Sequence, residues 1–380
     1  MATDKRHKIL NAPNLRFPEF EGEWELHRTT EYFEFKNGLN PEAKRFGDGI
    51  KFISVMDILN NRYITYDKII GCVVPNTDDL EDFGVNYGDV LFQRSSETLE
   101  DVGRANVYLD KKTALFGGFV IRGKKCGDYN PLFFRYLLSS PNVRKRIIIQ
   151  GAGAQHFNIG QEGLSKVYLN VPSKDEQKRV SQLFDLIDER IETQIGAISK
   201  QESLIKAMAG KLTCEGKKVR LADLVDCHSS TMQENDITND GYYPVYGATG
   251  ICGYTNSPLC NEDAIIIVKD GSGVGNIKYA CSGFSILGTL CYLTAKQNVS
   301  IGFVYCCLIN FDFSPYKTGM AIPHIYFKDY GKGKINIKSA AEQQKTKTLL
   351  FLLMEKLDVE RKLLAQYKLQ KQYLLSQMFV

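Results

Sequence analysis

The 380-residue sequence lacks any apolar run of the roughly 18 residues that a membrane-spanning helix needs. Its first residues, Met1 to Lys8, are charged and lead into no apolar segment of signal-peptide length. We therefore expect a cytoplasmic protein that spans no membrane. The formal net charge is only +4, which is compatible with nucleic-acid binding and equally with many cytosolic enzymes, so charge alone does not assign a function.

The ten cysteines include no C-x-x-C pair and no His/Cys spacing typical of a zinc site. We expect them to be reduced, mostly buried thiols, and we expect no metal site. The five histidines are isolated from one another in the sequence. Each is better explained as a structural or solvent-facing residue than as a catalytic base.

No nucleotide-binding or catalytic signature is present. The glycine-rich stretch Gly271 to Gly275 follows an apolar run, but it lacks the Rossmann spacing and the Gly-Lys-Ser/Thr of a P-loop, and a tight turn explains it better. There is no Asn/Asp-Pro-Pro-Tyr motif of an amino-methyltransferase, no G-x-S-x-G and no H-E-x-x-H. We therefore assign no catalytic residue and no cofactor.

What the sequence does contain is a second copy of itself, displaced by 166 positions. Ser173 and Glu176 form an S-x-x-E pattern, and Ser339 and Glu342 repeat it. This pattern predicts a capping box at the start of a helix in each copy. One unit, a globular region followed by a helix, is therefore repeated once.

The two globular regions, residues 17–172 and 219–338, have the short apolar runs and glycine punctuation of mixed α/β domains. Within the first, the helical spacing of apolar residues predicts one amphipathic helix over residues 131–149. The order of elements recurs in the second region. Residues 264–268, 274–279 and 291–293 correspond to the strands expected at 89–92, 102–108 and 119–121.

Each capped helix carries apolar residues at alternating four- and three-residue steps, which is typical of a coiled-coil seam. At ~1.5 Å per residue, helices of ~38–40 residues are about 57–60 Å long. An ordinary helical hairpin inside one larger domain is the alternative. The predicted seam residues are Val180, Phe184, Ile187, Ile191, Ile198, Leu350, Leu353, Leu357 and Leu364.

Several motifs together resemble the DNA-specificity subunit of type I restriction-modification systems. They are Leu15-Arg16-Phe17-Pro18-Glu19-Phe20 with Glu23-Trp24-Glu25, Pro172-Ser173 with Glu176-Gln177-Lys178, and Tyr243-Pro244-Val245-Tyr246-Gly247 with Gly250-Ile251 and Gly253-Tyr254. The resemblance covers nearly the whole chain. The second copy departs from the first before its cap, where Ile337-Lys338 replaces Val171-Pro172.

The resemblance implies an α+β fold in which two mixed α/β target-recognition domains occur in tandem, separated and held by two long antiparallel coiled-coil helices. The domains would be residues 1–172 and 214–338, and the helices 173–213 and 339–380. It also implies a non-catalytic subunit whose two domains each recognise half of a bipartite double-stranded DNA sequence. The implied partners are two modification (methyltransferase) subunits, which bring S-adenosylmethionine and methylate adenine, and restriction/translocase subunits.

Base recognition needs basic, amide or hydroxyl side chains on loops that face a groove. A single exposed Lys or Arg is more often ordinary solvated surface. Arg94 stands out because it directly follows an apolar strand, where a loop has a rigid support. The candidates in the first domain are Lys44, Arg45, Lys51, Arg94, Ser95, Arg104 and Gln155.

In the second domain the matching loop is Lys269 to Gly273, and the candidates are Lys269, Ser272, Lys278 and Lys317. The segment Gly151 to Asn158 matches Gly319 to His324, and we expect both to lie near a groove. The sequence does not define the target bases.

Two other classes of function remain open at this point. A self-sufficient enzyme with a diverged site would show methyl transfer or ATP hydrolysis as a purified single chain. A scaffold built on a helical hairpin would bind no DNA even with its partners present.

Overall fold

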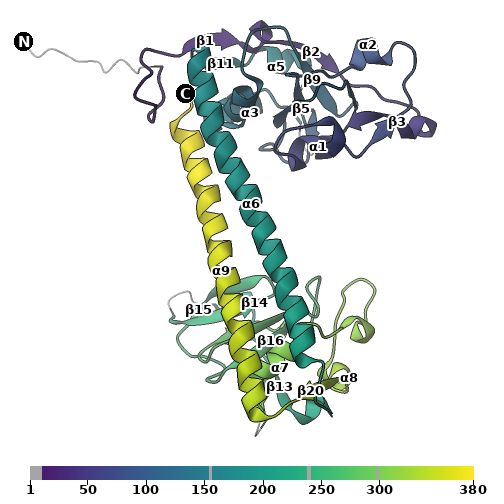
Figure 1. The fold of residues 1–380 in the computed structure, drawn as a ribbon, viewed down its shortest axis with the longest axis vertical. Coiled ribbons are helices and arrows are strands. Elements are labelled where there is room, and N and C mark those ends of the chain that lie inside the picture. Colours follow the sequence, from purple (N-terminus) through teal and green to yellow (C-terminus); the bar gives the residue numbers. More distant parts are fainter. Residues whose placement is uncertain (1–10, 154–155, 238–240, 297–298) are drawn as a thin grey trace, which may run out of the picture. The chain divides into compact units, whose positions relative to one another are not determined.

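The structure is a computed structural model that describes residues 11–153, 156–237, 241–296 and 299–380. Packing divides the chain into two units, and Figure 1 labels their elements. Unit 1 comprises Met1–Thr193 and Leu364–Val380, and unit 2 comprises Gln194–Leu363. Among the described helices none is long and apolar enough to cross a membrane.

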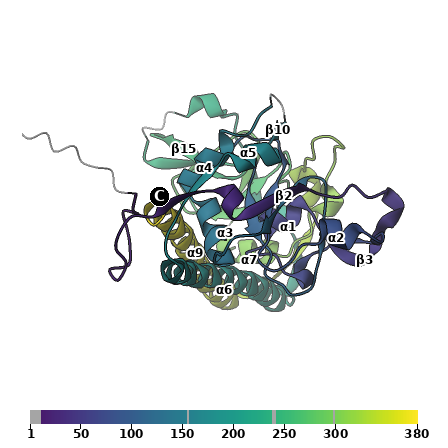
Figure 2. The ribbon, with the colours of Figure 1, turned by 90° about the horizontal axis from the view of Figure 1, so that it is seen from above.

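Unit 1 is built on an antiparallel sheet with the strand order β2-β9-β5-β7 and a smaller sheet with the order β4-β3-β8. All four residues of β5 are buried, which explains the apolar run Val90-Leu91-Phe92, and Gln93 is its one polar residue. Both views place β3 and α2 at the end of unit 1 that lies away from α6 (Figures 1 and 2). The bounds are β2 Phe33–Asn37, β3 Phe46–Ile53, β4 Cys72–Val73, β5 Val90–Gln93, β7 Ala105–Val107, β8 Leu115–Phe116, β9 Val120–Lys125, α1 Val55–Asn60, α2 Asp79–Phe83 and α5 Gln161–Ser165.

Unit 2 repeats this topology. Its main antiparallel sheet has the order β13-β19-β16-β17, and its smaller sheet has the order β15-β14-β18. In both small sheets the central strand pairs antiparallel with one neighbour and parallel with the other. The predicted tandem α+β fold is therefore confirmed. The bounds are β13 Val225–Ser229, β14 Tyr243–Gly247, β15 Gly250–Thr255, β16 Ala264–Val268, β17 Ile277–Ala280, β18 Ser285–Ile286, β19 Leu290–Ala295, α7 Ile301–Leu308 and α8 Phe327–Tyr330.

The single helix predicted over residues 131–149 is wrong. The structure has two helices there, α3 (Pro131–Ser139) and α4 (Pro141–Ile148). Pro141 has no N–H for a helical bond, and it disfavours a helical conformation at the residue before it, Ser140. Ser140 is accordingly extended, and α4 starts with Pro141 in its first turn.

Each long helix begins beside a two-stranded antiparallel ribbon. The ribbon of unit 1 pairs β1 (Glu25–Arg28) with β11 (Tyr168–Val171), and that of unit 2 pairs β12 (Lys217–Arg220) with β20 (Lys334–Ile337). The helices themselves are α6 (Lys174–Thr213) and α9 (Ala340–Gln377).

The two helix starts differ, which corrects the prediction of two equal capping boxes. At α9 the Ser339 hydroxyl accepts from the Glu342 amide at 3.4 Å, and the Glu342 carboxylate accepts from the Ser339 amide at 3.2 Å. At α6 the Ser173 hydroxyl accepts from the Glu176 amide at 3.4 Å, but the Glu176 carboxylate accepts from Arg16 instead. Arg16 offers a charged partner in a nearly buried position, where an ion pair is stronger than a bond to an amide.

The two helices run antiparallel within each unit. In unit 1 the Lys371 ammonium lies 2.5 Å from the Asp188 carboxylate. In unit 2 the Gln194 side-chain amide donates to the Glu360 carboxylate at 2.5 Å, and that of Gln201 donates to the Leu353 carbonyl at 2.9 Å. The residues proposed for the seam are all buried or half-buried: Val180, Phe184, Ile187, Ile191, Ile198, Leu350, Leu353, Leu357 and Leu364.

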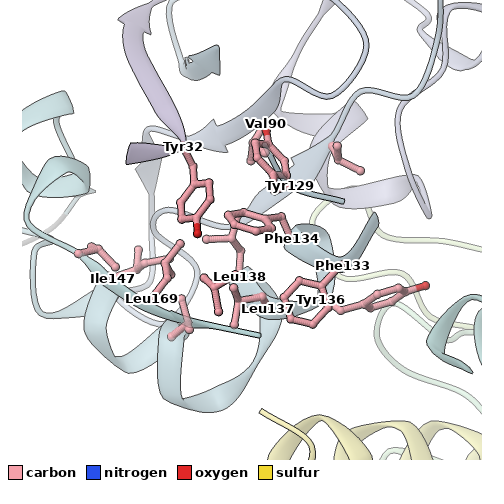
Figure 3. Close-up of a cluster of buried hydrophobic side chains, with 14 of the residues drawn as sticks. Tyr32, Val90, Tyr129, Phe133, Phe134, Tyr136, Leu137, Leu138, Ile147 and Leu169 are labelled. Atoms are coloured by element: carbon pink, nitrogen blue, oxygen red, sulfur yellow. The ribbon is translucent and has the colours of Figure 1, made fainter. Parts of the chain in front are cut away.

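The core of unit 1 is rich in aromatic side chains from α3 and the main sheet. Phe134 lies 4.2 Å from Tyr129 and 4.8 Å from Tyr32, measured between ring centroids, and Figure 3 shows these rings converging. The end of the chain completes this core, because Phe379 is only 2% exposed and contacts Phe133 and Phe184 at 5.5 Å each.

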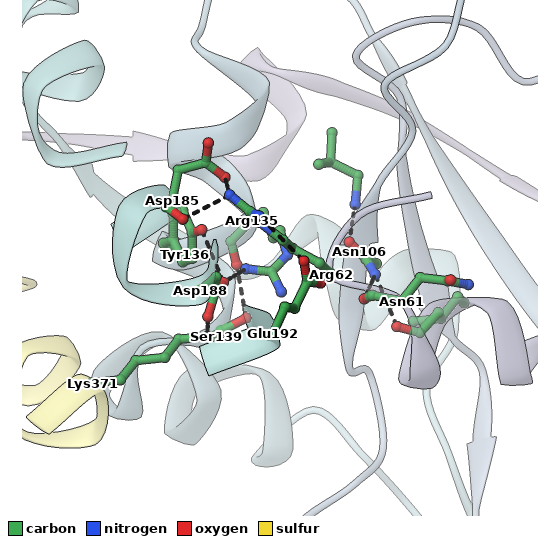
Figure 4. A network of polar contacts seen from close by, with 12 residues as sticks. Asn61, Arg62, Asn106, Arg135, Tyr136, Ser139, Asp185, Asp188, Glu192 and Lys371 are labelled. Carbon is green, nitrogen blue, oxygen red and sulfur yellow. Dashed lines mark hydrogen bonds and ion pairs between the residues drawn. The ribbon is translucent and has the colours of Figure 1, made fainter. Parts of the chain in front are cut away.

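Charged residues connect α6 to the rest of unit 1 beside this core. The Asp188 carboxylate accepts from Arg135 at 3.1 Å and from the Tyr136 hydroxyl at 3.0 Å, and Arg62 is paired with Asp185 (Figure 4). These contacts fix the orientation of α3 against α6.

Candidate nucleic-acid interface

The ends of strands β5 and β16 are built in the same way. The Arg94 amide donates to the Phe119 carbonyl at 2.9 Å, and the Lys269 amide donates to the Thr289 carbonyl at 3.1 Å. The carbonyl of Arg94 accepts from Ile159 at 3.0 Å, and that of Lys269 accepts from Ile325 at 2.9 Å. These matching bonds make Arg94 and Lys269 equivalent positions.

The same bonds bring a hairpin to each strand end. Ala152 and Asn158 exchange two backbone bonds of 2.9 Å, and Thr318 and His324 exchange bonds of 2.9 and 2.8 Å. The first residue of the turn in the second hairpin is Gly319, with φ +89°. A Cβ atom there would stand 2.3 Å from the Ile322 carbonyl oxygen, so only glycine is accommodated. The structure thus places the described residues of the first segment, 151–153 and 156–158, beside the residues that follow β5, and it places Gly319 to His324 beside those that follow β16.

Ser95 and Arg104 lie on the same side of unit 1 as Arg94. Ser95 belongs to β6 (Ser95–Ser96), which pairs with β10 (Phe157–Asn158), and its hydroxyl donates to the Asn158 side chain. The Gln93 amide donates to the Arg104 carbonyl at 2.7 Å. The Arg104 side chain is 53% exposed and pairs with Asp101 at 2.6 Å. Arg94 itself is half-buried, and one guanidinium nitrogen donates to the Gly118 carbonyl at 3.3 Å.

Sequence reasoning missed Arg144, which supports the loop before Arg104. One guanidinium nitrogen of Arg144 donates to the carbonyls of Glu100 at 2.9 Å and Val102 at 2.7 Å. Burial lowers the pKa of Arg144 to about 10, and the nearby Arg104 charge acts in the same direction. The group therefore remains charged at neutral pH. No sequence pattern marks it, because its acceptors lie more than 40 positions away in the chain.

The other candidates of unit 1 lie on and near the 3-10 turn Ala43–Arg45. Lys44 is 80% exposed and pairs with Glu42 at 2.7 Å. Arg45 is only 14% exposed, because it pairs with Asp79 and donates to the Val74 carbonyl at 2.9 Å. Lys51 is half-buried on β3. The turn thus offers one exposed cation, Lys44, and an internally paired one, Arg45.

In unit 2, Ser272 and Lys317 are exposed and Lys269 is half-buried. Lys278 lies on β17, and its ammonium is 4.5 Å from the centroid of the Tyr246 ring, so it belongs to a different part of the unit from the hairpin. Gln155 lies outside the described residues. Across the described ranges, no group of three His, Cys, Asp or Glu side chains is placed to hold a metal ion.

The sequence matches the family described as type I restriction modification DNA specificity domain over residues 21–199 and again over residues 215–368. The chain therefore belongs to this family. A protein of Mycoplasma genitalium named as a type I specificity subunit is 25% identical over 271 residues, which cover 65% of this chain and 70% of the relative. The type I restriction enzyme EcoKI specificity subunit of Escherichia coli is 25% identical over 195 residues, covering 48% of this chain and 41% of that subunit.

A solved structure supports the same fold. The crystal structure of the type I restriction-modification S subunit from M. genitalium has a TM-score of 0.63 and 20% identity, and the match covers 97% of this chain and 99% of that one. The relatives are named specificity subunits. These names agree with the expectation that the chain is the non-catalytic, DNA-recognising subunit of such a system.

Proposed function

We propose that this chain recognises a bipartite DNA sequence, with unit 1 recognising one half-site and unit 2 the other. The observation that carries the proposal is the duplicated site. Arg94 and Lys269 each directly follow a buried strand, and the backbone carbonyl of each accepts a hydrogen bond from the residue after a hairpin. Two equivalent recognition sites on one chain suit a target with two halves.

The side chains at these strand ends have the chemistry for base recognition. Arginine and lysine bind the guanine O6 and N7 atoms, and serine binds several base edges. In the proposal, Arg94, Ser95, Arg104 and Gln155 serve the first half-site, and Lys269, Ser272 and Lys317 serve the second. Lys44, Lys51 and Lys278 contact phosphates, and Arg45 shapes the turn that carries Lys44.

We further propose that α6 and α9 set the gap between the half-sites and bind the partner subunits. Residues 1–172 and 214–338 would be the recognition domains, and 173–213 and 339–380 the helices. Both helices cross the boundary between the units, which falls after Thr193 in α6 and after Leu363 in α9. The partners are two modification subunits, which methylate adenine, and restriction subunits. The complex would act on DNA in the cytoplasm.

Methylome sequencing tests the proposal directly. A host that expresses this chain with its modification subunit should acquire methylated adenines in one split motif with a constant gap. A host with the modification subunit alone is the control and should lack the motif. A continuous motif, or identical methylation in both hosts, would contradict the proposal.

The length of the helices offers a separate test of the gap. Seven residues inserted after Thr193 and seven inserted after Leu363 keep the seam in register and lengthen each helix by about 10 Å. The motif should keep both half-sites and acquire a longer gap, by at most about three base pairs at 3.4 Å each. An unchanged gap in an active complex would exclude the helices as the spacer.

A further inference from the structure

The hairpin of unit 2 presents apolar side chains at its tip. Met320 is 106% exposed, the highest value for a large apolar side chain in the described chain, and Ile322 is 67% exposed. Such exposure is unfavourable in water, since it orders solvent around apolar groups. An exposed apolar tip within a candidate binding surface indicates a contact that forms in a complex.

This tip is held in place by its backbone. Besides the paired bonds between Thr318 and His324, the Pro323 carbonyl accepts from the Gly271 amide at 2.9 Å. The Thr318 hydroxyl donates to the His324 carbonyl at 3.3 Å. The backbone that carries Met320 and Ile322 is therefore fixed, so only their side chains become ordered on binding.

The surroundings of the tip favour DNA as the occupant. The hairpin is bonded on one side to the segment that starts at Lys269 and is preceded directly by Lys317. These two cations, which the proposed function assigns to the second half-site, favour a polyanion such as DNA, and Asp270 is the one acidic side chain of the loop Lys269 to Gly273. A purely apolar protein surface would leave the two lysines without a partner, whereas DNA offers anionic and apolar groups together.

In the equivalent hairpin of unit 1 the described residues carry the exposed polar side chains of His156 and Asn158, and their one large apolar side chain, Phe157, is half-buried. The two hairpins share their closing bonds, and their described exposed side chains differ, as expected if they contact different groups in two different half-sites.

We propose that Met320 and Ile322 recognise thymine through its 5-methyl group in the half-site bound by unit 2. The inference rests on the function proposed above. The 5-methyl group of thymine is the apolar group that the major groove displays, and apolar side chains recognise it by contact. The tip thus selects A·T pairs at one or two positions without a hydrogen bond to a base.

Uracil provides the test, because it differs from thymine only by this methyl group. The complex with the modification subunit is titrated with duplexes of its methylome-defined target in which each thymine is replaced singly by deoxyuridine. At one or two positions of one half-site, the dissociation constant should rise about fourfold, the factor that corresponds to burial of one methyl group. Met320→Ala or Ile322→Ala should bring the ratio of the dissociation constants for the deoxyuridine and thymine duplexes close to one. The salt dependence of binding should not change, because no charge is removed.

Leu259→Ala is the matched control, since Leu259 is an apolar residue of unit 2 that is 45% exposed and lies outside the hairpin. This variant should retain the fourfold ratio. A wild-type complex that binds no specific duplex would overturn the proposed function. A complex that binds its target but does not distinguish thymine from uracil at any position, or that still does so in both hairpin variants, would overturn the hairpin inference alone. A tip that wedges between base pairs would give this second result.

Discussion

The two units attach to the long helices in chemically different ways. Matching bonds define the equivalent positions: the Asn130 amide before α3 donates to Gln177 of α6 at 2.9 Å, and the Ser300 amide before α7 donates to Gln343 of α9 at 3.2 Å. In this alignment the charged residues of unit 1 correspond to apolar ones in unit 2. The pairs are Arg135 with Tyr305, Asp188 with Met354, and Lys371 with Ile205.

The difference shows that one fold tolerates two kinds of junction, meaning the contact between the long helices and the short helix that packs on them (α3 in unit 1, α7 in unit 2). In unit 1 the Asp188 side chain is 8% exposed, so Arg135 and Lys371 depend on it for neutralisation. In unit 2 the residues Ile205, Tyr305 and Met354 line a hollow of about 980 Å³ and need no partner. A polar junction fixes orientation through specific bonds, whereas an apolar one tolerates substitution if volume is kept.

The largest effect should come from the end of the chain. Phe379 packs in unit 1 against three aromatic rings, whereas the equivalent residue in unit 2 is the half-buried Thr213. We expect Phe379→Ala to lower the free energy of unfolding by about 4 kcal/mol. Thr213→Ala should lower it by less than about 1 kcal/mol. Denaturant titration followed by the fluorescence of Trp24, the single tryptophan, measures the loss in unit 1, and circular dichroism measures the loss in unit 2. Equal losses would refute the comparison.

Only some of the features that distinguish the two units could be predicted from the sequence. The repeated caps and the seam periodicity are local patterns, and they located the two long helices and the tandem fold. The burial of Phe379 against Trp24 joins residues more than 350 positions apart in the chain, and no local pattern indicates it. For the same reason the sequence did not show that Glu176 would bond to Arg16, 160 positions away. Pro141, in contrast, was a visible signal for the break between α3 and α4.

The candidate site was predictable to a similar extent. Arg94 was selected as a candidate because it follows an apolar run, and Lys269 because its loop matches that of Arg94 in the repeat; both are features of the sequence alone. The internal pairing of Arg45 with Asp79 and the support that Arg144 gives to its loop are long-range contacts. Such contacts arise from the packing of strands and helices, and a single sequence does not specify them.

The second prediction concerns the charged junction. Asp188→Ala leaves Arg135 and Lys371 unpaired, and with these groups 14% and 21% exposed we expect a loss of about 3 kcal/mol. Replacing the network by apolar residues (Arg135→Tyr, Tyr136→Phe, Asp188→Met and Lys371→Ile) should recover at least about 2 kcal/mol relative to Asp188→Ala. The same fluorescence titration measures this. If the variant with all four substitutions is less stable than Asp188→Ala, the apolar contacts of unit 2 cannot replace the charged contacts of unit 1.

The third prediction compares the two helix caps. Glu176 is 1% exposed and bonds to Arg16 through two contacts of 2.7 Å, whereas Glu342 is exposed. Glu176→Ala leaves Arg16 without its partner, and we expect a loss of about 2 kcal/mol. Glu342→Ala should leave the stability nearly unchanged. Thermal unfolding of the two variants measures both losses of stability. A larger loss for Glu342→Ala than for Glu176→Ala would contradict the difference proposed between the two caps.

The fourth prediction compares base recognition with phosphate binding. Arg94→Ala should cost about 1–3 kcal/mol in binding and relax specificity at one position of the first half-site, and Lys269→Ala should do the same in the second. Lys44→Ala should instead weaken binding to all sequences and reduce the salt slope by about one. Methylation of every single-base variant of the target by each complex separates these outcomes. An unchanged preference profile in Arg94→Ala would show that Arg94 does not contact a base.

The last prediction is a pH dependence that originates in unit 2 and is absent at neutral pH. Burial in α7 raises the pKa of the Cys306 thiol to about 12 and that of the Cys307 thiol to about 12, whereas an unfolded chain ionises its thiols near pH 8.5. Because the folded pKa is the higher one, the stabilisation is complete below pH 8.5 and is lost as the pH rises toward 12. The decrease is at most about 1.4 kcal/mol per pH unit for each thiol. Denaturant titrations between pH 7.5 and 10 should therefore show a shallower decline for Cys306→Ala/Cys307→Ala than for the parent chain. Cys126→Ala, which removes an exposed thiol of unit 1, should follow the parent profile, and a shallower decline in that variant would place the effect elsewhere.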